Sequence, residues 1–492
     1  MTRIRISPAG VAFCLALATP SAAQLPSATQ IPVTEFAARR DSLAARVGDG
    51  VVVAFGGRTL VNDNGTFFQL PAFRYLTNFD EPDAALVMVV HAKKGASTLY
   101  LSPINARTAF YYGQRTDSAT SLRRTGIAGR PFSSLTATLD SLAKTGLTVF
   151  SLADFEDADF ARADSLTRGQ VFVKALAARH AGLVVRDAHP IVNELRARKS
   201  PAEIALLKKA ADISSEGHRA AMLTANPQHE YELRASLEYT FTKLGAERPG
   251  YGSIVGAGFN GTVLHYMKDT DPAKPGDLVV MDAAAEYHGY SADITRTIPV
   301  SGTFTPEQKQ VYQIVRDGQD AAERYSKAGM RPQVGQDSSV AVRARALAAL
   351  GLVESVEATF DPPWPVNCAQ QAAVCKQTNL WMIHGISHGI GLAVHDQLQS
   401  SFGDGTYKIG DAFTIEPGVY ISTHALDVLP DTPKNRAFIA KVRATVKKYE
   451  NTGVRIEDDY IITEKGLERI TTVPREIVEI EALMRQRGRI QP

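Results

Sequence analysis

The sequence has few cysteines, no long apolar run and no excess of either charge. Its 492 residues include three cysteines, 54 basic and 52 acidic side chains, so the formal charge is +2. This balance argues against nucleic-acid binding through a basic face, which needs an excess of lysine and arginine. The body of the chain contains no apolar stretch of ~18 residues, the minimum for a spanning helix. The composition, 44% hydrophobic and 22% charged, is typical of globular domains and not of disordered chains.

The first 23 residues have the pattern of a secretory signal. Two arginines precede a short apolar core at residues 10–18, and small residues lead up to Ala23. We therefore expect cleavage near Ala23 and export to the periplasm or the medium. A lipoprotein anchored through Cys14 is an alternative, but Phe13 is too large for the usual motif. A buried N-terminal helix is the other alternative.

Removal of this segment leaves two cysteines, Cys368 and Cys375, in a stretch rich in proline, glutamine and alanine. An isolated pair at this spacing in an oxidising compartment predicts a small disulfide loop. Two unpaired thiols are the alternative. A metal site from these two residues alone is disfavoured, because the exported chain has no further cysteine.

Two regions of different texture indicate two domains, an α/β domain over residues 24–190 and an α+β domain over residues 191–492. In the first region short apolar runs alternate with amphipathic helical runs, as in layered α/β domains. The strands we expect are 50–57, 85–90, 97–102 and 147–153, and the helices are 35–47, 134–145 and 170–181.

The second region opens on a strong helix signal. Ser200 is a favourable N-cap, Pro201 suits the first turn, and Glu203 completes a capping box. Further on, we expect a long helix over residues 306–329. Two segments, 357–380 and 424–451, resemble insertions.

A predicted hairpin over residues 278–300 carries two aspartates. A turn centred between Tyr287 and His288 places Asp282 directly opposite Asp293 on one face. Carboxylates so close repel, and they need a cation or a shared proton between them. A divalent metal held by both satisfies this need. Two exposed aspartates on a solvated hairpin are the alternative.

Three histidines, His384, His388 and His395, lie within 12 residues among several glycines. The glycines weigh against a helical zinc motif. A single histidine is often structural, but three so close together favour a functional site.

Two glutamates add to the set. Glu416 follows an apolar strand and precedes Pro-Gly, and Glu457 lies in a predicted strand two residues after Arg455. A glutamate in such a place costs free energy unless it is paired or binds metal. A salt bridge between Glu457 and Arg455 is the alternative.

Together these segments supply two Asp, two Glu and at least one His. Such a hard, anionic donor set suits Mn²⁺ or a similar divalent ion better than a sulfur-rich zinc site. Four carboxylates exceed the charge of one divalent ion but balance two. We therefore expect a two-metal centre that activates a bridging water for hydrolysis.

In order and in spacing, these motifs resemble the pita-bread (creatinase/aminopeptidase-like) metallopeptidases. The closest resemblance is to the Xaa-Pro aminopeptidases (aminopeptidase P), and residues 73–89 also resemble the N-terminal domain of that family. The resemblance covers about residue 35 to the C-terminus, apart from the two insertions. The motifs that carry it are YGSIVGAGFNGTVLHY (251–266), Asp282 with Asp293, HGISHGIGLAVHD (384–396), TIEPGVYI (414–421) and GVRIEDD (453–459).

The resemblance implies a role for each residue. The metal ligands would be Asp282, Asp293, His388, Glu416 and Glu457. The remaining site residues would be the substrate-contacting His265 and His395, the pocket residue His384 and the supporting Arg455. Glu416 would also transfer protons, and His265 and His395 would stabilise the tetrahedral intermediate.

The implied reaction removes the first residue from peptides with proline in second position. The cofactors would be two divalent ions, with Mn²⁺ favoured and Zn²⁺ or Co²⁺ as alternatives, and a homo-oligomer (dimer or tetramer) is expected. Xaa-Pro dipeptidase, with the same metal chemistry, is the nearest rival. A non-catalytic peptide-binding relative is disfavoured, because all five ligand types are present.

Overall fold

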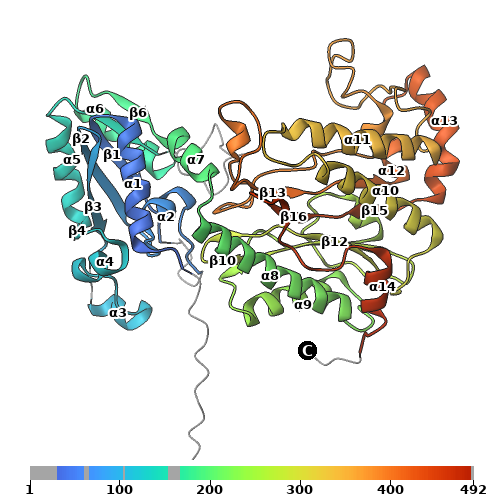
Figure 1. Cartoon of the computed structure of the whole chain (residues 1–492), viewed down its shortest axis with the longest axis horizontal. Coiled ribbons are helices and arrows are strands. Elements are labelled where there is room, and N and C mark those ends of the chain that lie inside the picture. Colours follow the sequence, from blue (N-terminus) through green and yellow to red (C-terminus); the bar gives the residue numbers. More distant parts are fainter. Residues whose placement is uncertain (1–29, 60–65, 104–105, 153–166, 489–492) are drawn as a thin grey trace, which may run out of the picture.

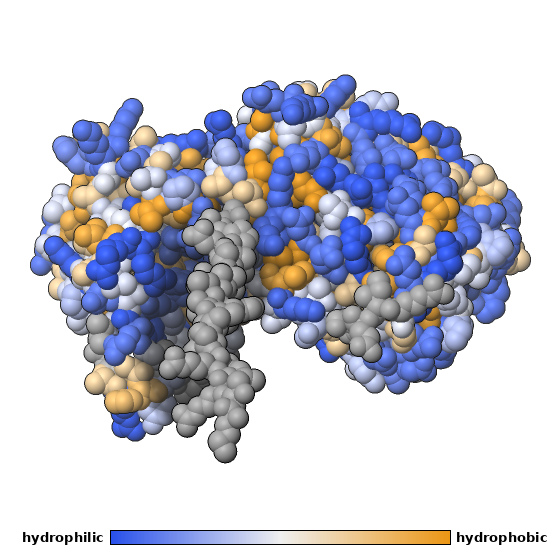
Figure 2. Space-filling view, turned by 60° about the horizontal axis from the view of Figure 1, so that its bottom comes forward, coloured by the Kyte–Doolittle hydropathy of each residue, from blue (hydrophilic) through white to orange (hydrophobic). Residues whose placement is uncertain are grey.

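The computed structural model describes residues 30–59, 66–103, 106–152 and 167–488. It has two lobes, one running from α1 to β6 and the other from α8 to α14 (Figure 1). The predicted signal segment lies outside the described residues. Within the ranges given above, no helix combines the length and the apolarity needed to cross a bilayer. On the face shown in Figure 2, hydrophobic side chains form scattered patches among hydrophilic ones.

The N-terminal lobe is built on a six-stranded mixed sheet in the order β4-β3-β2-β1-β5-β6. Its strands are β1 (Gly50–Phe55), β2 (Ala85–His91), β3 (Lys94–Leu101), β4 (Gly129–Pro131), β5 (Thr148–Ser151) and β6 (Val185–Asp187). Its helices are α1 (Val33–Val47), α2 (Pro71–Thr77), α3 (Ala106–Tyr112), α4 (Ser118–Thr125), α5 (Leu135–Ala143) and α6 (Arg168–Arg179). The expected alternation is confirmed, since every predicted strand and helix overlaps an observed one.

Helices cover both faces of this sheet. Leu43 of α1 packs with Val52 on one face, and Leu139 of α5 packs with Val53 on the other. A strand buried on both faces is apolar along its whole length, which explains why β1 could be recognised in the sequence. The next helix, α7 (His189–Ala197), packs against α1 and α2, and the predicted domain division at residue 190 falls near its start.

The second lobe begins at α8 (Pro201–Leu223), whose capping box is confirmed. The Ser200 hydroxyl accepts from the Glu203 amide at 3.2 Å, and the Glu203 carboxylate accepts from the Ser200 amide at 2.8 Å. The other helices are α9 (Glu230–Lys243), α10 (Pro306–Glu323), α11 (Pro332–Ala349), α12 (Thr423–Asp427), α13 (Pro433–Lys448) and α14 (Ile477–Met484). The helix expected over 306–329 therefore ends earlier, at Glu323.

The strands of the second lobe form small antiparallel sheets that helices cover. They are β7 (Arg248–Pro249), β8 (Ile254–Ala257), β9 (Leu278–Asp282), β10 (Ala285–Tyr287), β11 (Tyr290–Ser291), β12 (Thr295–Pro299), β13 (Ala412–Ile415), β14 (Gly418–Ile421), β15 (Thr452–Arg455), β16 (Asp458–Thr463) and β17 (Gly466–Arg469). One core joins Leu233 of α9, Val279 of β9 and Val311 of α10 with Val454 of β15. Helices α9 and α10 thus pack on strands that are far apart in the sequence, β9 and β15, in one core.

The register of the hairpin differs from the expectation. Thr295, and not Asp293, pairs with Asp282. The turn consists of His288 and Gly289, whose φ angles of 49° and 82° are both positive, as a two-residue type I′ turn requires. The predicted turn was centred one residue too early, which shifts the pairing by two residues. A shift of two keeps every side chain on its face, so both aspartates still face the same side.

The two insertion-like segments pack against each other. Segment 357–380 is mainly loop, and the predicted Cys368–Cys375 disulfide, which is confirmed, closes a small ring within it. Segment 424–451 contains α13, whose Asn435 side chain donates to the Asp361 carbonyl at 2.8 Å and accepts from the Asp361 amide at 2.9 Å. Lys434 forms an ion pair with the Asp361 carboxylate at 2.8 Å. The second segment therefore holds the first in place.

Candidate active site

The structure brings the five predicted metal ligands together from five separate segments. Asp282 ends β9, Asp293 precedes β12, Glu416 lies between β13 and β14, and His388 comes from the loop before β13. Glu457 lies between β15 and β16 and not within a strand, which corrects the expectation. Each side chain thus stands at the end of a strand or in a connection, where neighbouring backbone can hold it in a fixed direction.

His388 lies among three of the carboxylates. Its Nε2 atom is 3.4 Å from Asp293 Oδ2, 3.4 Å from Glu416 Oε1 and 3.9 Å from Glu457 Oε1. Asp293, His388 and Glu457 each offer a ligand atom, and these atoms all lie within 4.8 Å of one another. The backbone sets this geometry, because the His388 carbonyl accepts from the Thr414 amide of β13 at 2.9 Å.

Tyr251 connects the fourth carboxylate, Asp282, to this group. Its hydroxyl oxygen is 2.6 Å from Asp282 Oδ1 and 2.6 Å from Asp293 Oδ1. The two aspartates therefore meet although they are not paired in register. Sequence reasoning missed Tyr251, since one tyrosine in a glycine-rich segment gives no signal of its own.

Arg455 balances part of the negative charge. Its Nη2 donates to Asp282 Oδ2 at 2.6 Å, its Nη1 donates to the Tyr420 hydroxyl at 2.8 Å, and its Nε donates to Thr295 at 3.1 Å. In the described part of the chain, the ion pair of Arg455 is with Asp282. The alternative in which Arg455 pairs with Glu457 is therefore wrong.

Charge and burial set the protonation of the cluster. Burial raises the pKa of Asp282 and of Glu457, and it raises the pKa of Glu416 to about 7. Burial alone would lower the pKa of His388, but its hydrogen bond to Asp293 and the Glu416 charge raise it to about 10. Burial, with repulsion between the carboxylates added to it, thus makes these groups retain protons that exposed, isolated carboxyls would lose.

The donor set fits divalent cations. Four carboxylates and one imidazole supply mainly oxygen atoms, which hard divalent ions prefer. Asp282, Asp293 and Glu457 are at most 8% exposed, so no water shell balances their charge. Thr295 donates to Glu457 Oε2 at 2.7 Å, which leaves Oε1 facing His388.

The other predicted histidines surround this cluster. His384 Nε2 is 2.8 Å from the Tyr420 hydroxyl, and His384 Nδ1 is 3.6 Å from Glu416 Oε2. Burial and the nearby Arg455 charge lower the pKa of His384 to about 3, so its ring is neutral. The ring of His395 packs on that of His388 with centroids 4.1 Å apart.

His265 is exposed and lies farther out. It follows Leu264, whose carbonyl is 3.5 Å from Arg455 Nη2. The structure therefore places His265 at the rim of the cluster and not within hydrogen-bonding range of the carboxylates as they stand.

Asp459 is a further residue that sequence reasoning missed. It is fully buried, and its two oxygens accept from the Asp293 amide at 3.2 and 3.1 Å. The signal was present in the acidic run EDD at residues 457–459, but the strand alternation does not say which member faces the site.

Asp396 fastens the histidine loop to the segment between the lobes. It pairs with Arg196 at 2.9 Å and with Lys199 at 3.5 Å, and it accepts from the Leu392 amide at 3.0 Å. Burial alone would raise the pKa of Asp396, but the two cations lower it. Gly391 must be glycine here, because a Cβ atom would lie 1.9 Å from Asp396 Oδ2.

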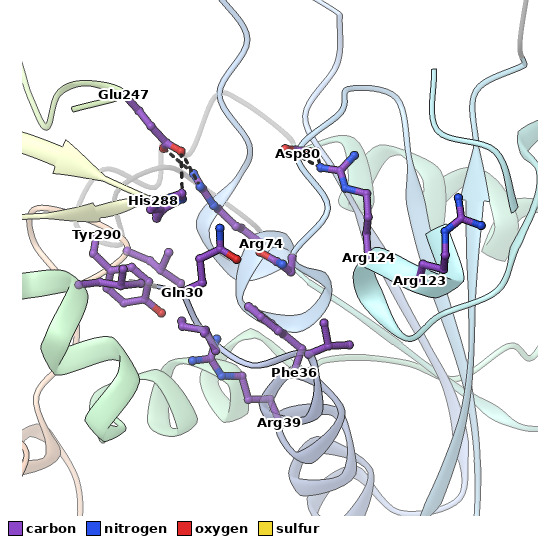
Figure 3. Close-up of a pocket in the computed structure, with 15 residues that line it drawn as sticks. Gln30, Phe36, Arg39, Arg74, Asp80, Arg123, Arg124, Glu247, His288 and Tyr290 are labelled. Carbon is purple, nitrogen blue, oxygen red and sulfur yellow. Dashed lines mark hydrogen bonds and ion pairs between the residues drawn. The ribbon is translucent and has the colours of Figure 1, made fainter. Parts of the chain in front are cut away.

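Two cavities lie between the lobes. One of about 500 Å³ is lined by Gln69 of the N-terminal lobe together with Arg248, Tyr251 and Val394, so it reaches the carboxylate cluster. The other, of about 450 Å³, contains none of the predicted site residues. There Arg74 pairs with Glu247, and Arg124 pairs with Asp80 (Figure 3).

Comparison with known proteins gives consistent matches. Residues 205–464 match metallopeptidase family M24, and residues 36–150 match the N-terminal domain of aminopeptidase P. Xaa-Pro aminopeptidase of Escherichia coli K12 is 31% identical over 470 residues, which cover 93% of this chain and 98% of that protein.

Solved structures match equally well. E. coli aminopeptidase P with the inhibitor Pro-Leu has a TM-score of 0.76 and 30% identity, covering 92% of this chain and 98% of that one. The Zn-substituted E. coli aminopeptidase P in complex with product has a TM-score of 0.75 and 29% identity over the same shares.

Proposed function

Because this chain belongs to metallopeptidase family M24, we propose that it is a two-metal aminopeptidase that releases the first residue from peptides with proline in second position. The convergence of Asp282, Asp293, His388, Glu416 and Glu457 supports the proposal most directly. The N-terminal lobe borders the cavity that leads to this cluster, which favours short or unfolded chain ends as substrates. The named relatives are Xaa-Pro aminopeptidases, which favours this function over that of a dipeptidase.

The proposed chemistry is hydrolysis of the bond before proline. Proline has no amide hydrogen and a fixed φ, so an enzyme that requires a substrate N–H at this position handles the bond poorly. The divalent ions, when bound, would polarise the carbonyl and lower the pKa of water. Glu416 accepts the proton of the attacking water and passes it to the proline nitrogen, the general acid–base role that a carboxylate beside the reacting atoms can fill.

The surrounding residues position the substrate. His265 and His395 donate to the peptide and to the developing oxyanion. His384, held by Tyr420, forms a wall of the proline pocket. Arg455 keeps the Asp282 carboxylate aimed into the site through their 2.6 Å ion pair.

We further propose Mn²⁺ as the preferred ion, because the donor atoms are mainly carboxylate oxygens. We propose that the protein is exported after cleavage near Ala23 and that it forms a dimer or a tetramer. Export is tested by the N-terminal sequence of the protein recovered outside the cytoplasm. Retention of the full chain inside the cell would contradict it.

The function is tested by metal analysis combined with product analysis. We expect two metal equivalents per chain and release of alanine from Ala-Pro-Leu, with Ala-Ala-Leu as the matched control that resists cleavage. A chelator abolishes the activity and Mn²⁺ restores it. Cleavage of Ala-Ala-Leu at the same rate, or full activity after metal removal, would refute the proposal. If the enzyme cleaves the dipeptide Ala-Pro but not the tripeptide Ala-Pro-Leu, the protein is a dipeptidase.

A further inference from the structure

We propose that a cavity of about 350 Å³ beside His384 is the subsite for the third residue of the substrate and that it favours an apolar side chain there. This inference rests on the proposed function and extends it to a substrate preference. The walls of this cavity come from α11, from the loop before His384 and from segment 357–380, which carries the disulfide.

The cavity adjoins the catalytic group through one shared side chain. His384 lines it, and the same imidazole is 3.6 Å from Glu416 Oε2. The cavity on the other side of the cluster, which contains Tyr251, is lined by residues that are buried or half-buried, apart from the exposed Gly252. An aminopeptidase holds one residue before the cut bond and a chain of open length after it. The chain after the cut therefore leaves on the His384 side, where the wall is exposed.

The exposed wall is apolar. Trp364, Val374 and Ile383 are 44%, 38% and 47% exposed, and all three line this cavity. Single exposed apolar residues are common on protein surfaces, but a group that surrounds a cavity next to a catalytic residue marks a binding site. These three side chains can contact one apolar side chain of the substrate.

A buried cation at the same cavity has no charged partner. Arg343 is 1% exposed, and its Nη1 donates to the Gly418 carbonyl at 2.9 Å. Its Nη2 has no hydrogen-bond partner among the described residues, and Arg343 forms no ion pair within them. An uncompensated buried charge is costly. The carbonyl oxygens or the free carboxylate of a peptide in the cavity would offset that cost.

The apolar wall is held rigidly. The Trp364 ring packs edge-on against Phe360, with centroids 6.2 Å apart. Phe360 is fully buried, and its amide donates at 2.9 Å to the carbonyl of Cys375, one of the two disulfide-bonded cysteines. A preformed wall loses little entropy on binding, which makes it an effective recognition surface.

The side-chain preference is tested with Ala-Pro-Leu, Ala-Pro-Gly and Ala-Pro. We expect the metal-loaded enzyme to prefer leucine over glycine in third position by about tenfold in kcat/KM, the usual range for an apolar pocket, mainly through KM. In Trp364→Ala this ratio falls to about threefold or less, and Trp364→Phe restores most of it. Because Ala-Pro lacks a third residue, the Trp364→Ala substitution lowers kcat/KM for Ala-Pro far less than for Ala-Pro-Leu. Tyr239→Ala removes an aromatic ring that is 59% exposed on α9, and it leaves the ratio unchanged.

The role of the cation is tested separately by amidation of the peptide. We expect the free acid Ala-Pro-Leu to be preferred over its amide by about fivefold, because hydrogen bonds to charged groups are the stronger ones. Arg343→Met keeps the stem that packs on Gly318 but removes the charge, and it abolishes this preference. Arg343→Lys retains it. The leucine-over-glycine ratio persists in both variants.

The outcomes separate this proposal from the proposed function. Cleavage of all three peptides with equal kcat/KM by the wild-type enzyme would overturn the subsite and leave the aminopeptidase intact. An equal loss on Ala-Pro and Ala-Pro-Leu in Trp364→Ala would also overturn it. If the metal-loaded wild-type enzyme cleaves none of the three, the proposed function itself fails.

Discussion

Glu416→Gln should stabilise the metal-free protein while it abolishes catalysis. The carboxylate is nearly enclosed, and the pKa of Glu416 is raised from 4.5 to about 7, first by burial and then by Asp293. Each pKa unit corresponds to about 1.4 kcal/mol, so the ionised side chain costs the folded state about 3 kcal/mol at pH 7 and above. This value already includes the attraction of His388, which opposes the repulsion. Glutamine keeps the shape and removes the charge.

The sign of the pH dependence follows from the raised pKa. Between pH 4.5 and 7 the folded protein holds a proton on Glu416 that the unfolded chain has lost, so the wild type loses stability as pH rises. The difference in free energy of unfolding between Glu416→Gln and the wild type is therefore near zero at pH 4.5, grows up to about pH 7 and then stays constant. Addition of Mn²⁺ reverses the order, because only the wild type retains the full ligand set.

The assay is thermal unfolding in EDTA at several pH values, with and without Mn²⁺. Glu216→Gln is the matched control, because that side chain is 56% exposed and lies outside the cluster. It should follow the wild type throughout. The reasoning is refuted if, in EDTA at pH 8, Glu416→Gln unfolds at a lower temperature than the wild type while the control variant does not. The buried charge of Glu416 would then not destabilise the folded protein.

Three further substitutions test other parts of the site. Asp293→Ala should remove metal binding and peptidase activity yet keep the fold, which metal analysis and circular dichroism check; full activity in the metal-stripped variant would contradict it. Tyr251→Phe should lower kcat by about tenfold or more through loss of a hydrogen bond to a charged group, while metal content measured by mass spectrometry falls only slightly. Asp396→Asn should lower the free energy of unfolding by about 3 kcal/mol, because it leaves the buried cations Arg196 and Lys199 without a negatively charged partner at this position. Since the pKa of Asp396 is lowered, this cost is full above pH 4 and shrinks as the pH falls further, and a denaturant series at pH 3 and pH 7 that showed equal gaps would count against it.

The fold was predictable where the signal is local. The Ser200 capping box and the apolar strand β1 depend on residues close in sequence, and both are as expected. The hairpin register was missed because it depends on the φ angles of His288 and Gly289. The residue pattern allows two turn positions that differ by a single residue.

The candidate site was predictable as a set of residues and not as a geometry. Carboxylates within or next to apolar strand sequences are conspicuous, so Asp282 and Glu457 could be identified from the sequence. Tyr251 and Asp459 act through residues far away in the chain, and nothing in their neighbourhood shows it. The pairing of Arg455 with Asp282 could not be predicted for the same reason, since Asp282 reaches it only through tertiary packing.

The buried pairing of Asp396 with Arg196 and Lys199 has a mechanical consequence. The stretch that joins the two lobes is anchored to the loop that carries His388, so it makes a poor hinge. Any rocking of one lobe against the other would pull on the catalytic imidazole or break a desolvated ion pair. Widening of the entrance between the lobes is therefore opposed at this point, which favours selection by size through a preformed aperture over selection by a closing motion.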